Sequence, residues 1–187
     1  MKKFELTNEF ITNMFGTKLF RIRALVEFGD VEAGELGGYV EKESNLGHDD
    51  NAWVYGNAWV YGDAQVSGDA RVYGNARVYD NAWVYGNAQV SGDARVCGDA
   101  RVCGNGDYAY AHGFGSVNRT TTFFRLKDGG VGVRCGCFYG TLAQFRDKIR
   151  ETHGETKKAQ EYLMLADLME LRFEEDENEV GNRKYVE

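Results

Sequence analysis

Nine consecutive hexapeptides between residues 51 and 104 constrain the fold of this chain more than any other feature. Each reads Asn or Asp, Ala, a variable residue, Val, a second variable residue and Gly, with Asp80 at one of the Gly positions. Ala and Val lie two residues apart, so they share one face of a short strand and the variable residues share the other. Gly followed by Asn or Asp supplies a turn, because these residues tolerate positive φ. The repeat therefore predicts a solenoid rather than an ordinary globular core.

Three strand-turn units make one coil of a triangular prism, so the chain is expected to stack on itself every 18 residues. Successive coils then lie about 4.8 Å apart, with Ala and Val along the prism axis. The pattern continues back to Gly38 and Leu46, but two extra residues near Asp49 and Asp50 predict a bulged corner. Tyr108 stands where a Val belongs, and we expect the solenoid to end there because the axis has little room for a Tyr.

The variable residues point outward and form columns of large side chains on three prism faces. The first face carries Trp53, Arg71 and Gln89 beside Tyr55, Tyr73 and Ser91; the second carries Trp59, Arg77 and Arg95 beside Tyr61, Tyr79 and Cys97; the third carries Gln65, Trp83 and Arg101 beside Ser67, Tyr85 and Cys103. These columns either only stiffen the solenoid, through cation–π and stacking contacts, or form a contact surface rich in hot-spot residues. We expect the second face to be the contact surface, and a flat face to offer a small ligand little concavity.

The two ends of the solenoid need caps, since the end coils expose unpaired strand edges. The predicted organisation is an N-terminal β cap (1–36), the β-helix (37–112), a C-terminal ββαα module (113–173) and an acidic, disordered tail (174–187). Within the module, the segments 121–126 and 131–137 flank Lys127–Gly130 and predict a hairpin.

Two helices follow this hairpin in the sequence. Thr141 opens a capping box and Gly154 ends the first helix; Thr156 begins the second. The second helix carries a broad apolar stripe, which we expect to be buried: Tyr162, Leu163, Leu165, Ala166, Leu168, Met169 and Leu171.

Composition limits the function classes. The net charge of −7 argues against general nucleic-acid binding, which requires a basic surface. No apolar run approaches the length of a membrane span, and the first residues are too polar for a secretory signal. The four cysteines form no disulfide framework. We therefore expect a cytoplasmic protein with a protein partner, or an inhibitor that imitates acidic surfaces.

Candidate catalytic or metal-binding residues are few. His48 lies at the register shift and His112 just past the last coil, so either is a possible general base near a neighbouring chain, but neither has a recognisable carboxylate partner. His153 ends a helix, where its role is structural. Cys135 and Cys137 are expected on one face of a strand without the second ligand pair that zinc needs. We expect no metal and no cofactor.

The hexapeptides resemble the left-handed parallel β-helix of the hexapeptide-repeat proteins, a scaffold shared with bacterial transferases. A more specific resemblance is to a group of phage and prophage proteins with this repeat. It rests on residues 18–25 (KLFRIRAL) and 28–38 (FGDVEAGELGG) and covers roughly residues 4–104. The resemblance implies left-handed winding of the solenoid and an origin in a mobile genetic element. It gives less indication of a particular activity. It also implies self-association as a dimer or trimer, which is common among hexapeptide β-helices.

These observations lead to one principal functional hypothesis and three alternatives. The principal hypothesis is a non-enzymatic phage-type protein that binds a host protein and inhibits a bacterial defence system. The alternatives are an acyl- or nucleotidyl-transferase with His48 or His112 in an inter-subunit cleft, a polymer-forming scaffold, and a protein that sequesters a nucleotide signal.

Overall fold

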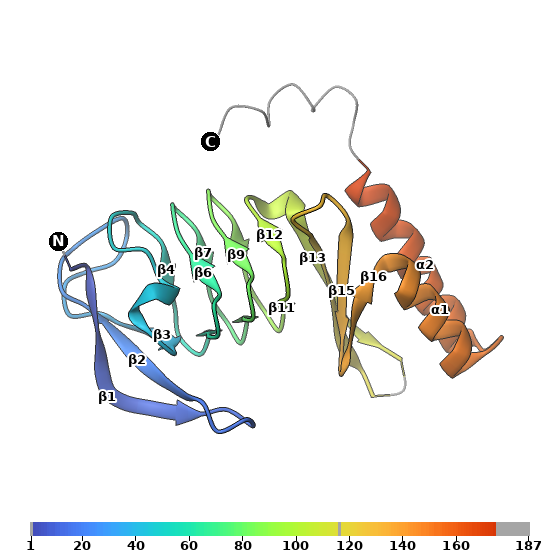
Figure 1. Cartoon of the computed structure of the whole chain (residues 1–187), viewed down its shortest axis with the longest axis horizontal. Helices are drawn as coiled ribbons and strands as arrows, with labels where there is room; N and C mark the ends of the chain where they lie inside the picture. Colours follow the sequence, from blue (N-terminus) through green and yellow to red (C-terminus); the bar gives the residue numbers. More distant parts are fainter. Residues whose placement is uncertain (1, 116, 175–187) are drawn as a thin grey trace.

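The computed structural model describes residues 2–115 and 117–174. It shows a β-solenoid of about four turns with an antiparallel β cap at each end and two helices beyond the C-terminal cap (Figure 1). The predicted mainly-β solenoid is thus confirmed, whereas its left-handed winding remains a prediction from the resemblance. None of the helices in the described ranges has the length and apolar composition that a membrane crossing requires.

The solenoid strands are short because each hexapeptide turns after four residues. They are β4 (Trp53–Val54), β5 (Trp59–Val60), β6 (Gln65–Val66), β7 (Arg71–Val72), β8 (Arg77–Val78), β9 (Trp83–Val84), β10 (Gln89–Val90), β11 (Arg95–Val96) and β12 (Arg101–Val102). They form three parallel stacks, β4-β7-β10, β5-β8-β11 and β6-β9-β12, one for each prism face.

Strand pairing confirms the register. Val54 pairs with Val72 and Val72 with Val90, so the coils repeat every 18 residues as predicted. Before β4 the spacing is two residues longer, since Val40 pairs with Val60 and Leu46 with Val66. The two extra residues therefore lie in the corner between Leu46 and β4, close to the short 3-10 helix η1 (Glu43–Asn45).

Ala and Val fill the axis of the prism, and every one of them in the nine hexapeptides is at most 1% exposed. The turn glycines from Gly56 to Gly98 have φ between 57° and 72°, a backbone conformation that costs a residue with a Cβ about 1–2 kcal/mol. Asp80 adopts the same conformation, with φ 59°, which Asp tolerates better than most residues. The repeat thus reflects two requirements: small and medium side chains along the axis, and residues that tolerate positive φ at the corners.

The N-terminal cap is a hairpin of β1 (Phe4–Thr12) and β2 (Lys18–Ala24) that continues through β3 (Leu36–Val40). β2 pairs antiparallel with β3, and β3 pairs parallel with β5, so the cap extends the sheet of the second prism face. Phe4 and Phe28 pack their rings against Trp53.

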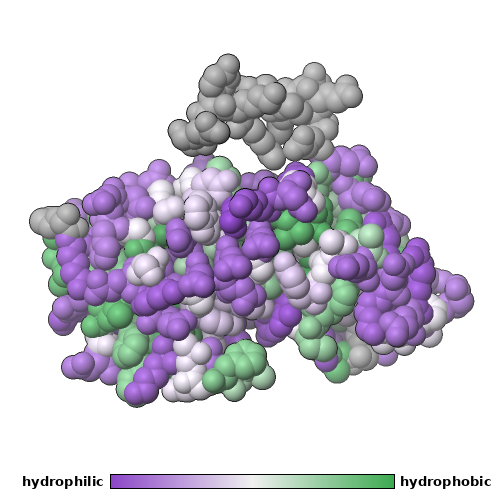
Figure 2. Space-filling view, in the orientation of Figure 1, coloured by the Kyte–Doolittle hydropathy of each residue, from purple (hydrophilic) through white to green (hydrophobic). Residues whose placement is uncertain are grey.

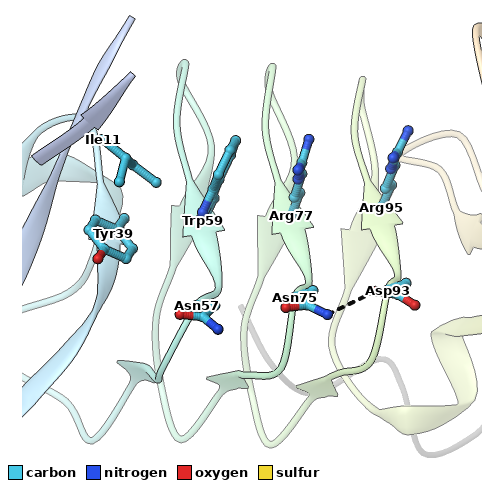
Figure 3. Close-up of a pocket in the computed structure, with 8 residues that line it drawn as sticks. All are labelled: Ile11, Tyr39, Asn57, Trp59, Asn75, Arg77, Asp93 and Arg95. Carbon is cyan, nitrogen blue, oxygen red and sulfur yellow. Dashed lines mark hydrogen bonds between the residues drawn. The ribbon is translucent and has the colours of Figure 1, made fainter. Parts of the chain in front are cut away.

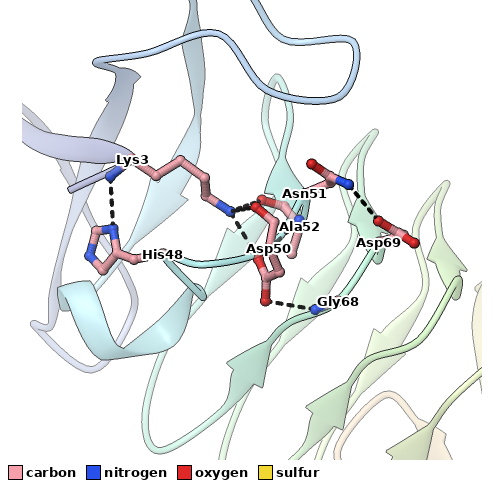
Figure 4. Close-up of polar contacts among 7 residues, drawn as sticks. All are labelled: Lys3, His48, Asp50, Asn51, Ala52, Gly68 and Asp69. Carbon is pink, nitrogen blue, oxygen red and sulfur yellow. Dashed lines mark hydrogen bonds and ion pairs between the residues drawn. The ribbon is translucent and has the colours of Figure 1, made fainter. Parts of the chain in front are cut away.

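A buried lysine ties this cap to the bulged corner (Figure 4). The Nζ of Lys3 donates to the Asp50 backbone oxygen (3.0 Å), Asp50 Oδ1 (3.0 Å) and the Ala52 backbone oxygen (2.8 Å). Asp50 Oδ2 in turn accepts from the Gly68 backbone N–H of the next coil (2.7 Å). The extra residues therefore serve as an anchor for the N-terminal strand.

The C-terminal cap is a four-stranded antiparallel sheet of β13 (Tyr108–Phe114), β14 (Arg119–Arg125), β15 (Val131–Cys135) and β16 (Phe138–Thr141), reached through the 3-10 helix η2 (Asn105–Asp107). The expected hairpin is β14–β15, and the sheet has two further strands that we did not predict. It also begins at Tyr108, inside the segment assigned to the β-helix. Phe124 faces the solenoid core, whereas its neighbour Phe123 belongs to the second core beneath the helices.

The helices α1 (Leu142–His153) and α2 (Lys157–Phe173) pack on the outer face of this sheet. Their predicted caps at Thr141, Gly154 and Thr156 are confirmed. The predicted buried stripe of α2 is wrong in part, because Leu168 is 54% and Leu171 67% exposed. The buried positions of α2 follow the narrower side that meets α1 and the sheet. The acidic tail lies, from residue 175 onward, outside the described residues.

Candidate ligand-binding groove

The structure brings the predicted outward side chains together in the expected columns. On the second face Trp59 pairs with Arg77 and Arg77 with Arg95; on the first, Trp53 pairs with Arg71; on the third, Trp83 pairs with Arg101. Two of the predicted Trp–Arg contacts form: Arg77 lies 4.0 Å from the Trp59 ring centroid and Arg101 4.8 Å from that of Trp83.

Three of the outward side chains are not available as surface. Trp53 is 0% exposed because the N-terminal cap covers it, so its assignment to a binding surface is wrong. Tyr79 is 9% exposed, so its assignment to a binding surface is wrong as well, and Cys97 is 1% exposed. They lie near Arg134 and Tyr139 of the C-terminal sheet, which covers this end of the second face. Burial raises the pKa of Tyr79 and raises that of Cys97 to about 11, so both stay protonated at neutral pH.

The remaining part of the second face forms a groove of about 480 Å³ (Figure 3). Trp59, Arg77 and Arg95 form one row along β5, β8 and β11. A second row consists of Asn57, Asn75 and Asp93, and Ile11 and Tyr39 from the N-terminal cap close one end. The face that we expected to be flat is thus bounded at one end, because β1 and β3 continue its sheet and contribute Ile11 and Tyr39.

The charges in the groove distinguish the second face from the other two faces of the prism. The guanidinium groups of Arg77 and Arg95 make no hydrogen bond or ion pair with any residue in the described ranges. Elsewhere Arg71 pairs with Asp30 (3.0 Å) and Arg146 with Asp167 (2.8 Å). Among the described residues, Asp93 is the one carboxylate in the lining and accepts from Asn75, so the two guanidinium groups on adjacent coils leave the groove with an excess of positive charge that favours anionic groups.

Sequence reasoning missed the second row and the end wall of the groove. Asn57, Asn75 and Asp93 are also 18 residues apart, so the period predicts their alignment, but we considered them only as corner residues. Asn75 Nδ2 donates to Asp93 Oδ1 (3.1 Å), which ties neighbouring corners together. Ile11 and Tyr39 carry no such signal, because only the docking of the N-terminal hairpin places them here.

The other two faces offer less to a ligand. On the first face, the Tyr55 hydroxyl donates to Asp30 Oδ1 (3.0 Å) and Arg71 pairs with the same carboxylate. On the third, Arg101 Nη1 donates to the backbone oxygens of Asn81 (3.0 Å) and Ala100 (2.8 Å). The cations of these faces are thus already satisfied, whereas those of the second face are not.

The stacked tyrosines beside the groove belong to its border. Tyr61 and Tyr79 lie parallel, with ring centroids 5.0 Å apart and an interplanar angle of 3°. Burial also raises the pKa of Tyr61, with the neighbouring Arg77 acting in the opposite direction.

The histidines have partners in the caps. His48 accepts from the Lys3 backbone N–H at Nδ1 (3.2 Å) and stacks on Phe4 (4.4 Å). Its Nε2 lies 3.9 Å from Glu43 Oε2, so the expectation that His48 lacks a carboxylate partner is wrong. His112 Nδ1 lies 2.8 Å from Thr120 Oγ1. Both contacts are those of structural residues, and neither ring lines the groove.

The cysteines differ from expectation at the β15–β16 turn. β15 ends at Cys135, and Cys137 is an exposed turn residue, so the two sulfurs do not share a strand face. Over the residues the structure describes, no group of three or more His, Cys, Asp and Glu side chains is arranged to hold a metal ion.

Figure 2 shows a largely hydrophilic surface with a hydrophobic area where the end of the β1–β2 hairpin lies. Its exposed apolar side chains are Phe10, Met14 and Phe15, at 46%, 88% and 78% exposure. The hairpin tip follows Ile11 closely in the sequence, and Ile11 lines the end of the groove. The tip therefore adds exposed apolar surface that a protein partner could contact.

Comparison with known proteins supports the repeat but not an activity. A family described as the YdcK Beta solenoid repeat matches residues 64–78, 70–86, 76–92 and 88–104. These segments all lie within the hexapeptides, so the chain is similar to this family between residues 64 and 104, which is part of its solenoid. No curated protein matches the chain. The match and the fold together identify a β-helix repeat protein.

Proposed function

We propose that this β-helix repeat protein is a non-enzymatic binding protein that engages a host protein through the second-face groove. The observation that carries the proposal is the pair of guanidinium groups of Arg77 and Arg95, which lack acidic partners in the described residues and stand beside Trp59. Trp, Tyr and Arg are the residues on which interface hot spots most often depend.

The chemistry of the groove favours a partner with an acidic segment. Arg77 and Arg95 lie on coils about 4.8 Å apart, a spacing that suits two carboxylates of one segment. Arg binds carboxylates with two parallel N–H···O bonds, which adds orientation as well as affinity. The partly exposed Trp59 offers apolar surface next to this charged part. Two cations beside one large aromatic side chain suit a protein segment better than an inorganic ion.

The biological setting of the proposal rests on the resemblance of residues 4–104 to phage and prophage hexapeptide proteins. A phage-encoded protein would act in the bacterial host cytoplasm, where the groove would inhibit a defence system by occupying an acidic segment of one of its components. In this proposal the chain self-associates as a dimer or trimer and leaves the groove open.

The test begins with affinity purification of the wild-type protein from a bacterial host, followed by identification of bound proteins by mass spectrometry. The double variant Arg77→Glu/Arg95→Glu places like charges against an acidic partner and should weaken binding at least about 100-fold. Arg101→Glu, on the third face, is the matched control and should change binding less than about threefold.

Two further results complete the test. Binding should weaken as salt rises, because exposed charge pairs are screened. Expression of the wild type, and not of the double variant, should restore plaque formation in a host with an active defence system. The proposal is wrong if the wild type recovers no specific partner, or if the double variant and Arg101→Glu bind equally well.

A further inference from the structure

A second cavity, of about 270 Å³, lies in the C-terminal module, away from the solenoid groove. It is enclosed by the C-terminal half of α1, by Tyr162 of α2, and by the ends of β14 to β16. Because none of the groove residues contributes to it, this cavity is independent of the function proposed above.

The floor of the cavity is a chain of four rings in contact. Phe138 lies 5.5 Å from Phe145, Phe145 lies 5.8 Å from Tyr162, and Tyr162 lies 5.9 Å from His153 between ring centroids. Ile149, 4% exposed, completes the apolar part. Such walls favour a planar ligand, because aromatic rings gain from stacked and edge-to-face contacts with one another.

The rim of the cavity is basic. Arg119, Lys148 and His153 line it, and no carboxylate does so among the described residues. Lys148 pairs with Glu151, whereas the Arg119 side chain makes no hydrogen bond or ion pair with any residue that the structure describes. The cavity therefore offers a charge for an anion at one side and rings at the other.

Arg119 Nη1 packs against Gly136 in the β15–β16 turn. Gly136 has φ 60°, a backbone conformation that favours glycine, and a Cβ at this position would displace the flexible end of the Arg119 side chain. Tyr162 is fixed as well, since its hydroxyl donates to the Phe114 backbone oxygen (3.2 Å).

From this geometry we infer that the C-terminal module binds a small aromatic anion, with its ring against Phe138, Phe145 and Tyr162 and its charged group on Arg119. The volume sets the size of the ligand. A cavity of about 150 Å³ accepts a benzene ring, so one of about 270 Å³ suits a molecule of one or two rings. A carboxylate and a phosphate both fit the planar guanidinium, so both are included in the test.

The experiment titrates the full-length protein with naphthoate, with naphthyl phosphate and with the neutral naphthylmethanol, and follows backbone amide shifts by NMR. At least one anion should bind with shifts concentrated at the cavity, and at least about tenfold more tightly than the neutral compound. Arg119→Met should remove this preference. Arg125→Met is the control, because Arg125 lies on the same strand, contacts Gly129 and Phe173, and does not line the cavity.

Circular dichroism and the melting temperature establish that both variants are folded. The inference is overturned if neither anion binds, if the neutral compound binds the wild type as tightly as the anions do, or if Arg119→Met retains the preference. Shifts confined to the second-face groove would also overturn it, and that outcome would leave the proposed function untouched.

Discussion

The buried Lys3 offers a quantitative test of how the N-terminal cap is held. Lys3 is 2% exposed and donates three hydrogen bonds to Asp50 and Ala52, whereas the adjacent Lys2 forms a surface pair with Glu43 at 2.6 Å. Replacing either lysine by Met keeps most of the aliphatic stem and removes only the ammonium group. The two variants therefore compare a buried with an exposed ion pair at neighbouring positions.

The expected magnitude follows from the contacts. In Lys3→Met, two backbone oxygens and one carboxylate oxygen lose a charged donor, and each such bond is worth about 1.5–3 kcal/mol. Two effects make the expected loss of stability smaller than the sum of these three hydrogen bonds. The wild-type ammonium is itself desolvated, which lowers the pKa of Lys3, and the Asp50 side chain remains 23% exposed. We therefore expect Lys3→Met to lower the free energy of unfolding by about 2–3 kcal/mol, and Lys2→Met by less than about 0.5 kcal/mol.

Urea unfolding at neutral pH, followed by circular dichroism, measures both values. Hydrogen exchange adds a local readout, because the Gly68 N–H bonded to Asp50 should exchange faster in Lys3→Met. If Lys3→Met unfolds within about 0.5 kcal/mol of Lys2→Met, the buried contacts do not stabilise the cap and the reasoning is refuted.

Three further predictions concern the turns, the thiols and alkaline pH. Gly74→Ala should lower the free energy of unfolding by about 1–2 kcal/mol, because φ is 72° and the new Cβ would lie 3.0 Å from the backbone nitrogen of Gly92 in the next coil. Gly106→Ala is the control: it has open space around it and should lower the free energy of unfolding by less than about 0.5 kcal/mol. Equal losses in the two variants would contradict this prediction. A thiol reagent followed by peptide mapping should modify the exposed Cys137 in the native protein and the buried Cys97 only after unfolding; early modification of Cys97 would show that the C-terminal sheet does not cover it. Burial raises the pKa of Cys97 from 9.0 to about 11, and burial with the Asp30 carboxylate raises that of Tyr55 from 10.0 to about 12. The folded state favours the neutral forms of both groups. Their contribution to the free energy of unfolding is therefore complete below about pH 9 and is lost as the pH rises toward 12. Urea midpoints that stay constant across this pH range would exclude this contribution.

Much of the solenoid is predictable because its rules are local. Alternation along a strand assigns Ala and Val to the axis, the Gly positions assign the corners, and the 18-residue period aligns Trp59, Arg77 and Arg95. The pairing of these residues on successive coils confirms the prediction. The extra residues before Ala52 were also visible as a change of spacing, although their role as the anchor for Lys3 was not.

The covered and uncovered parts of the outward columns were not predictable in this way. Trp53 and Trp59 occupy equivalent positions in successive hexapeptides, yet the first is buried and the second lines the groove. The difference arises from residues such as Phe4 and Phe28, which pack on Trp53 from the N-terminal cap. In α2, likewise, an apolar stripe does not reveal that Leu168 faces away from the sheet.

The sequence by itself therefore determined the solenoid, its period, the contents of its axis and the columns of its faces, because each depends on contacts that recur at a fixed separation. Only the tertiary structure decided which columns remain open, since this depends on how two non-repeating ends dock on the prism. The N-terminal strands both bury Trp53 and wall the second face with Ile11 and Tyr39. The groove exists because non-local packing covers some repeat positions and leaves Arg77 and Arg95 without acidic partners among the described residues.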